Sequence, residues 1–181
     1  MDLKEIREWA QFAFLIVGGT LGLVAFFQNL RQRRLENALK LVSSFRDSLR
    51  EGDLAHWEEL FHASSEPTGA KPGHYVAEHG GQHSISEYFS EGSGDGYAIS
   101  RMAQNLEIIC HEICEMTVDA RIVWFELGQL LNTMHEWLSH IPGHSGKASL
   151  LESAFPSMAR AFEKHGKKFH RWPTRPYAYI E

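Results

Sequence analysis

The longest uninterrupted apolar stretch of the chain lies near its N-terminus. Residues 12–27 read FAFLIVGGTLGLVAFF and contain no charged side chain. With its apolar neighbours the stretch approaches the roughly 20 residues that a helix needs to cross about 30 Å of hydrocarbon. A basic cluster follows at once: Arg31, Arg33 and Arg34. The pattern predicts a transmembrane anchor over residues 1–30.

Two other interpretations of this stretch stay open. A cleaved signal peptide would have a basic leader and a small-residue cleavage site. This leader is mixed in charge, and bulky Phe26 and Phe27 stand where cleavage would fall. A buried core helix is the second alternative, because the uninterrupted run is short for a membrane span.

The charges that flank the stretch predict its orientation. Basic side chains after it outnumber Lys4 and Arg7 before it, and positive charge is retained on the cytoplasmic side of a membrane. We therefore expect a single-pass membrane protein, with its N-terminus outside and its C-terminal domain in the cytoplasm. The same basic side chains suit anionic headgroups, so the lipid bilayer is an expected partner.

Small and apolar positions also suggest contact between copies of the chain. Gly18 and Gly22 are four residues apart, a spacing that lets two membrane helices approach closely, although membrane helices also simply tolerate glycine. Beyond the anchor, apolar side chains recur at steps of three and four, as in a coiled-coil seam: Leu35, Ala38, Val42, Phe45 and Leu49. The pattern predicts a helical stalk to about Arg50 and a homo-oligomer.

Residues 31–63 and 64–97 differ in composition and are expected to differ in structure. In the first, residues 51–53 break the stalk, and Asp53 is the predicted N-cap of a short helix. The second is rich in Gly, Ser, His and Pro, which predicts a long surface insertion with one helical turn at 85–89.

Residues 98–181 predict a cytoplasmic helical domain. Two periodic apolar faces, in 99–116 and 123–137, indicate a helical hairpin with a tight turn at 117–119, where Asp119 is the expected N-cap. No stretch of the chain alternates with period two, so the fold is predicted to be all-α.

A last helix is expected after the hairpin. Ser149 and Glu152 form a capping-box pattern at its start. Pro156 predicts a kink or a restart within it, and Gly166 predicts its end.

Composition limits the classes of function. With 181 residues, 43% of them hydrophobic, the chain beyond the anchor is long enough for one domain with its own core. A formal net charge of −5 argues against a general nucleic-acid binder, which needs clustered Lys and Arg. Cys110 and Cys114, four residues apart on a predicted helix, are expected to be free thiols.

Three histidines of the insertion are the candidates for a metal site. His74, His79 and His83 carry imidazole nitrogens that suit zinc. Their spacing matches no strong zinc signature and the glycines around them indicate a loop, so neither a metal nor a cofactor is expected.

Three polar side chains recur every four residues on one predicted helix: Glu107, His111 and Glu115. We interpret them as a solvent-exposed face on which charged side chains pair locally.

One pair of Arg and His residues is the candidate for a catalytic site. Arg160 and His165 are separated by four residues, as in helical ribonuclease domains in which histidine moves a proton and arginine steadies the phosphate. Arg50 and His56 match the same loose pattern. Chance produces about as many matches in a chain of this composition, so the spacing alone does not indicate an enzyme.

The layout of anchor, basic exit, stalk and hairpin resembles an uncharacterised bacterial family of short single-pass membrane proteins with a helical cytoplasmic domain. The match is specific around residues 105–138, which read NLEIICHEICEMTVDARIVWFELGQLLNTMHEWL. The layout is also similar to that of the small membrane accessory proteins of type VI-B CRISPR systems. That resemblance implies a ring-shaped homo-oligomer whose N-terminal helices line a pore, with a degenerate ribonuclease-like element carried over onto Arg160 and His165.

These features favour a homo-oligomeric inner-membrane protein that forms a pore or perturbs the membrane, as an accessory factor in antiviral defence or stress response. Its further partner would be a cytosolic defence effector. One alternative is a membrane-tethered ribonuclease that uses Arg160 and His165 across a dimer interface. Another is a scaffold that recruits a cytosolic partner through an aromatic and basic tail, although the same tail could only strap the bundle: Arg171, Trp172, Arg175, Tyr177 and Tyr179.

Overall fold

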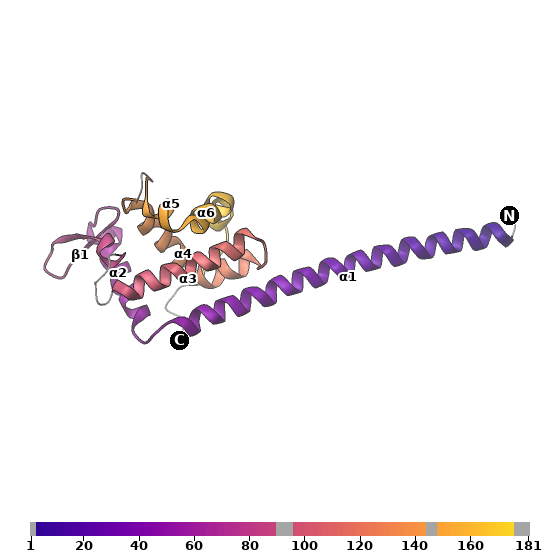
Figure 1. Ribbon diagram of the computed structural model, residues 1–181, viewed down its shortest axis with the longest axis horizontal. Helices are drawn as coiled ribbons and strands as arrows, with labels where there is room; N and C mark the ends of the chain where they lie inside the picture. The colour runs from indigo at the N-terminus through magenta and orange to yellow at the C-terminus, as the bar shows by residue number, and fades with distance from the viewer. Residues whose placement is uncertain (1–2, 90–95, 144–147, 176–181) are drawn as a thin grey trace.

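A long N-terminal helix projects from a helical domain that holds the remaining elements (Figure 1). The computed structural model describes residues 3–89, 96–143 and 148–175. Helices dominate this part of the chain, so the all-α prediction is confirmed. One small hairpin of strands was not expected, because strands of three residues are too short to show an alternating pattern.

The elements follow one another in this order: α1 Leu3–Ser48, α2 Asp53–Ser64, η1 Glu66–Thr68, β1 His74–Val76, β2 Gln82–Ser84, η2 Ile85–Phe89, α3 Gly96–Cys114, α4 Ala120–His140, α5 Leu150–Ala154 and α6 Pro156–Phe169. Strands β1 and β2 pair antiparallel. The 3-10 helix η2 confirms the predicted helical turn, and it places Ile85 in the core.

Helix α1 is unbroken to Ser48, which confirms the predicted continuation of the anchor into a stalk. The apolar seam of the stalk, however, packs inside the chain itself. Val42 and Phe45 are buried in the domain core, Leu49 packs against that core, and α1 lies along α4. These side chains are therefore not free to contact a second copy, whereas Leu35 remains 39% exposed. A 3-4 apolar spacing predicts that one face of the helix is buried, and another helix of the same chain can bury that face as well as a second copy can.

The predicted hairpin forms in chain order, with α3 and α4 joined by the turn at 115–119. Its two helices nevertheless pack chiefly on other elements, α3 on α6 and α4 on α1. Two periodic faces predict that both helices are buried, but they do not say which neighbour buries each one.

The predicted helix starts are partly confirmed. Asp119 caps α4 by accepting a 2.9 Å hydrogen bond from the Arg121 N–H, and Ser149 Oγ accepts one of 3.3 Å from the Glu152 N–H. The N-cap of α2 is Gly52, with a φ of 88°, and not Asp53, so that prediction was wrong by one residue.

The last helix restarts at Pro156, as predicted, but continues past Gly166 to Phe169, so the predicted end was wrong. Its first turn has no cap from its own N-cap residue. Instead, the carboxylate of Glu107 on α3 accepts hydrogen bonds of 2.7 and 2.8 Å from the N–H groups of Ser157 and Met158. Glu107 thus satisfies two free donors of α6, and its interpretation as part of a solvated face was wrong.

The described part of the C-terminal tail straps the domain. The Arg175 N–H donates a 2.7 Å hydrogen bond to the carbonyl of Phe125 on α4, and Trp172 is partly buried against the core. A Cβ added at Gly128 would lie 2.5 Å from Thr174 Cγ2, so the tail approaches α4 where α4 has no side chain. Residues 171–175 therefore belong to the bundle, while Tyr177 and Tyr179 lie outside the described residues.

We predict that Gly128→Ala lowers the melting temperature by several degrees, because the new methyl group would lie 2.5 Å from Thr174 Cγ2 of the tail and 3.0 Å from the Trp124 ring, at a cost of about 1–3 kcal/mol. Gly166→Ala is the matched control, since a Cβ there meets open space within α6. It should stabilise the protein by about 0.5–1 kcal/mol through helix propensity. Thermal unfolding followed by circular dichroism measures both, and equal effects of the two substitutions would contradict the strap.

Candidate membrane-interface site

Helix α1 leaves the domain at a point fixed by two hydrogen bonds. The Asp119 N–H donates to the carbonyl of Arg34 at 3.1 Å, and Asn37 Nδ2 donates to the carbonyl of Thr117 at 3.1 Å. Both partners belong to the α3–α4 turn. The turn therefore docks on α1 within the first helical turns after the apolar stretch, and the part of α1 N-terminal to that point projects from the domain (Figure 1).

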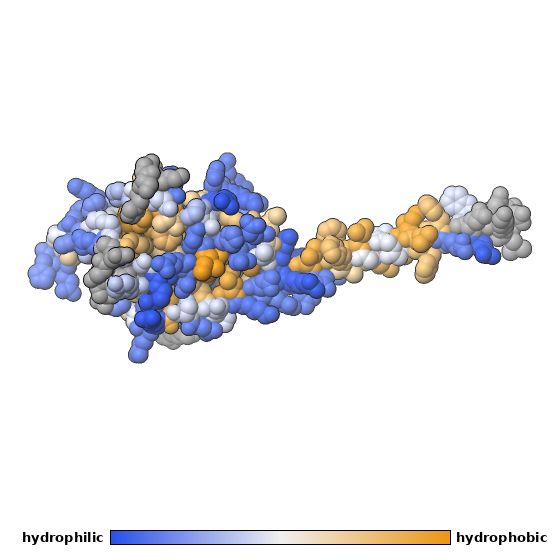
Figure 2. Space-filling view, viewed as in Figure 1, coloured by the Kyte–Doolittle hydropathy of each residue, from blue (hydrophilic) through white to orange (hydrophobic). Residues whose placement is uncertain are grey.

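The projecting part of α1 is an apolar sleeve, which we define as residues 11–30. Its most apolar window has a mean hydropathy of 1.7 and no buried residue. Large apolar side chains stand open along it, among them Phe14 at 80% and Phe27 at 64% exposed (Figure 2). By length and composition α1 can span a membrane, and the alternative of a buried core helix is wrong.

Both glycines that were singled out lie in the sleeve. Nothing stands within 4 Å of a Cβ added at Gly18 or Gly22. The small-residue face is therefore open in the single chain.

A hollow of about 510 Å³ lies where the sleeve meets the domain. We call it the junction pocket. One wall comes from α1, the other from the end of α3, the turn and the start of α4, and His165 of α6 completes it. Its lining residues are Phe27, Leu30, Arg31, Arg34, Ile113, Met116, Val118, Asp119, Ala120 and His165.

Positive charge gathers around this junction. Hydrophilic side chains collect where α1 leaves the domain, beside the apolar sleeve (Figure 2). Arg31 and Arg34 line the junction pocket, while Arg33 is exposed on the same turn of α1 but does not line it. On the facing element, Lys164 of α6 donates a 3.3 Å hydrogen bond to the carbonyl of Cys114. This end of the domain therefore presents cations at the depth where α1 would leave a bilayer.

Met116 occupies an unusual place in the junction pocket. Its φ of 57° lies in the left-handed region, where glycine or asparagine usually ends a helix. Its side chain is 55% exposed and lines the pocket beside the sleeve. The fold thus holds an apolar side chain open to solvent at a backbone position that disfavours it, next to the apolar sleeve of α1.

The candidate catalytic pair does not converge within the chain. Arg160 and His165 lie on the continuous helix α6. With four residues between them, they are five positions apart, which places them roughly 140° apart around the helix axis. Arg160 is exposed, whereas both ring nitrogens of His165 are shielded from solvent and have no partner among the described residues. Burial, together with Lys164 and Lys168, lowers the pKa of His165, so its ring is neutral at pH 7.

The three histidines of the insertion do not form a metal cluster. His74 faces Ser84 across the β-hairpin, while His83 stacks on Tyr75 with ring centroids 5.6 Å apart. Across the described ranges, no group of three or more His, Cys, Asp or Glu side chains is placed to hold a metal ion.

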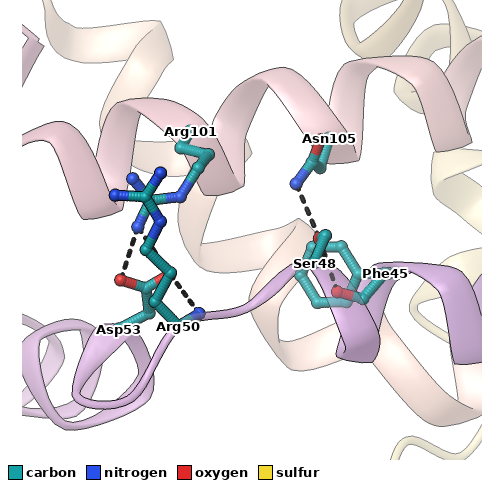
Figure 3. A network of polar contacts seen from close by, with 6 residues as sticks. All are labelled: Phe45, Ser48, Arg50, Asp53, Arg101 and Asn105. Carbon is teal, nitrogen blue, oxygen red and sulfur yellow. Dashed lines mark hydrogen bonds and ion pairs between the residues drawn. The ribbon is translucent and has the colours of Figure 1, made fainter.

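The second Arg and His pair does share a pocket, of about 420 Å³, at the junction of α1, α2 and α3. Arg50 and His56 line it together with Asp53, Tyr97 and Arg101 among others. Asp53 is hydrogen-bonded to both Arg50 and Arg101 (Figure 3). Its carboxylate accepts hydrogen bonds of 2.6 and 2.7 Å from Arg101 and one of 2.9 Å from the Arg50 N–H.

These contacts are structural, because they tie the α1–α2 turn to α3. Burial alone would raise the pKa of Asp53, but the hydrogen bonds from Arg101 and Arg50 and their positive charges outweigh it and hold the pKa below its usual value. A second link lies beside it, where Asn105 donates a 2.8 Å hydrogen bond to Ser48 Oγ (Figure 3). The buried aspartate was recognised in the sequence only as a helix cap, since its partner lies 48 residues away.

The two cysteines are free and buried. Burial raises the pKa of the Cys110 thiol well above its usual value and that of Cys114 to a lesser degree, because Arg160 and Lys164 partly offset it. Both thiols are therefore protonated and poorly reactive at neutral pH.

No protein family, no curated protein and no solved structure matches this chain.

We predict that Asp53→Asn lowers the free energy of unfolding by about 2 kcal/mol at pH 7, because Arg101 loses a charged partner. The folded state lowers the pKa of Asp53, so its contribution is full above the unfolded pKa of about 3.9 and disappears as pH falls through the folded pKa. Urea titrations of both proteins at pH 7 and pH 3 measure the difference.

Asp47→Asn, on the exposed face of α1, is the control and should leave stability unchanged. A penalty for Asp53→Asn that is as large at pH 3 as at pH 7 would contradict the charge-based account.

Proposed function

We propose that this chain is a single-pass membrane protein that holds its helical domain against the cytoplasmic surface of a membrane and acts as a self-associating platform instead of an enzyme. The open apolar sleeve carries the proposal, since a surface of this extent is unfavourable in water. Its 20 residues, 11–30, rise about 30 Å as a helix, which matches the hydrocarbon thickness of a bilayer.

Continuity of α1 supports an anchor over a cleaved leader. The helix runs without a break from the sleeve into the core, where Ala38 and Phe45 are buried. Cleavage after the apolar stretch would cut inside a regular helix. The basic side chains at Arg31, Arg33 and Arg34 support a cytoplasmic domain.

The composition of the sleeve favours a platform over a water-filled pore. The sequence of residues 12–27 has a single polar side chain, that of Thr20, and its hydroxyl donates a 2.7 Å hydrogen bond to the Ile16 carbonyl of the same helix. A ring of such helices would offer water an apolar lining, which tends to dewet. We therefore propose assembly without conduction, with a cytosolic effector as the partner that the platform recruits.

Self-association is proposed to use the open glycine face of the anchor. Close backbone approach at Gly18 and Gly22 gives packing that lipid tails cannot replace. The predicted coiled-coil seam does not support this step, because Ala38, Val42, Phe45 and Leu49 pack within the domain.

The proposed topology predicts the accessibility of introduced thiols in spheroplasts. The native thiols are buried, so they give little background. Asn132→Cys, exposed on α4, should react with a membrane-impermeant maleimide only after the membrane is permeabilised, whereas Arg7→Cys should react at once. Immediate reaction of Asn132→Cys in intact spheroplasts, or release of the protein by alkaline carbonate, would overturn the proposal.

Gly22→Leu should reduce the mass of the detergent-solubilised oligomer, because the added bulk separates the helix backbones, while insertion persists since leucine favours the bilayer interior. Ala13→Leu is the matched control, since it adds bulk about 180° around the same helix. Light scattering in a mild detergent measures both masses. An unchanged mass for Gly22→Leu would exclude this face, and a monomeric wild type would exclude assembly.

A further inference from the structure

We propose that the junction pocket binds one anionic phospholipid of the cytoplasmic leaflet, with the lipid phosphate on Arg31 and Arg34. This inference rests on the proposed membrane anchoring, and it assigns the pocket a ligand class that anchoring alone does not require. Position, wall chemistry and charge each support it.

The position of the pocket matches the change from hydrocarbon to headgroup. Phe27 and Leu30, the last apolar side chains of the sleeve, line its membrane side, and Arg31 and Arg34 follow one and four residues after Leu30. Phe27 and Arg34 are about 10 Å apart along the axis, close to the thickness of one headgroup layer together with the first methylenes. A lipid of the inner leaflet would therefore meet both kinds of side chain in the right order.

The opposite wall is apolar and belongs to the domain. Ile113, Met116, Val118 and Ala120 face the sleeve across a volume of about 510 Å³. That volume is within the range of small-molecule pockets and holds a headgroup with the start of one acyl chain, while the rest of the lipid follows the apolar surface of α1. The exposed Met116 would gain a hydrocarbon neighbour on binding.

The charges of the pocket suit a monovalent anionic headgroup. Two arginines and the single carboxylate of Asp119 line it, which leaves one net positive charge. The Asp119 carboxylate already accepts the Arg121 N–H as the cap of α4, so it is held at the helix start. Arginine binds phosphate through two parallel N–H donors, and Arg31 and Arg34 lie on one face of α1 because they are three residues apart.

His165 adds a second observation at the same wall. Its two ring nitrogens are shielded from solvent and unpaired within the described chain. The His165 ring therefore lies beside the pocket without a hydrogen-bond partner. After a small side-chain rotation, a lipid glycerol or headgroup hydroxyl would be such a partner.

The test uses the full chain purified in detergent with equal amounts of phosphatidylcholine and phosphatidylglycerol, and native mass spectrometry to count the lipids retained. Wild type should keep one phosphatidylglycerol in preference to phosphatidylcholine. Arg34→Gln should weaken retention about tenfold, because a charge-assisted hydrogen bond is lost. Arg33→Gln removes the same charge from the same turn but lies outside the pocket, so it should retain lipid as wild type does.

A second variant tests the pocket without changing a charge. Ala120→Phe places a ring into the apolar wall and should abolish retention with every arginine in place. Equal retention by Arg33→Gln and Arg34→Gln would overturn the site in favour of diffuse surface charge, as would unchanged retention by Ala120→Phe. Resistance to alkaline carbonate is measured for each variant: extraction overturns the membrane anchor itself, whereas an inserted chain without selective retention overturns the lipid site alone.

Discussion

The structure depends on one helix, α1, whose N-terminal part is apolar and exposed and whose C-terminal part packs in the domain core. In the proposed membrane, the backbone of the apolar stretch of α1 would have to satisfy its own N–H and C=O groups, which a helix does. In the domain, the same helix contributes Val42 and Phe45 to a core shared with α4. Since no break separates the two parts, the orientation of the domain follows from that of the anchor.

The attachment of the domain to this helix is local and mostly polar beside the apolar part of α1. The α3–α4 turn is held through the backbone of Asp119 and the side chain of Asn37, and farther along Arg46 binds Glu126 on α4 at 2.6 Å. Glu126 also lies 3.6 Å from Arg175, so α1, α4 and the tail meet at one carboxylate. This chain of contacts fixes the junction pocket between the α3–α4 turn and the basic residues that follow the apolar part of α1.

Local signals in the sequence predicted local structure well. The cap at Asp119, the restart at Pro156 and the run of α1 into the stalk all depend on near neighbours, and all are confirmed. Partner choice could not be predicted in this way. A 3-4 apolar spacing looks the same whether its partner is α4 or a second chain, and the roles of Glu107 and Asp53 depend on residues about 50 positions away. The candidate site was visible only as a basic cluster, because its apolar wall comes from α3 and α4.

Pulsed electron paramagnetic resonance on the full chain in nanodiscs tests the central claim most directly, with labelled chains diluted into an excess of unlabelled wild type so that distances between copies do not contribute. Spin labels at Ala25→Cys and Ser43→Cys would lie on one face of α1, eighteen residues and about 27 Å apart along a straight helix. One label is in the sleeve and the other is beside the core, and both positions are exposed in the single chain. The account predicts a single narrow distance distribution near that value. A broad distribution, or one with a clearly shorter maximum, would show a hinge at the membrane exit and contradict a continuous helix.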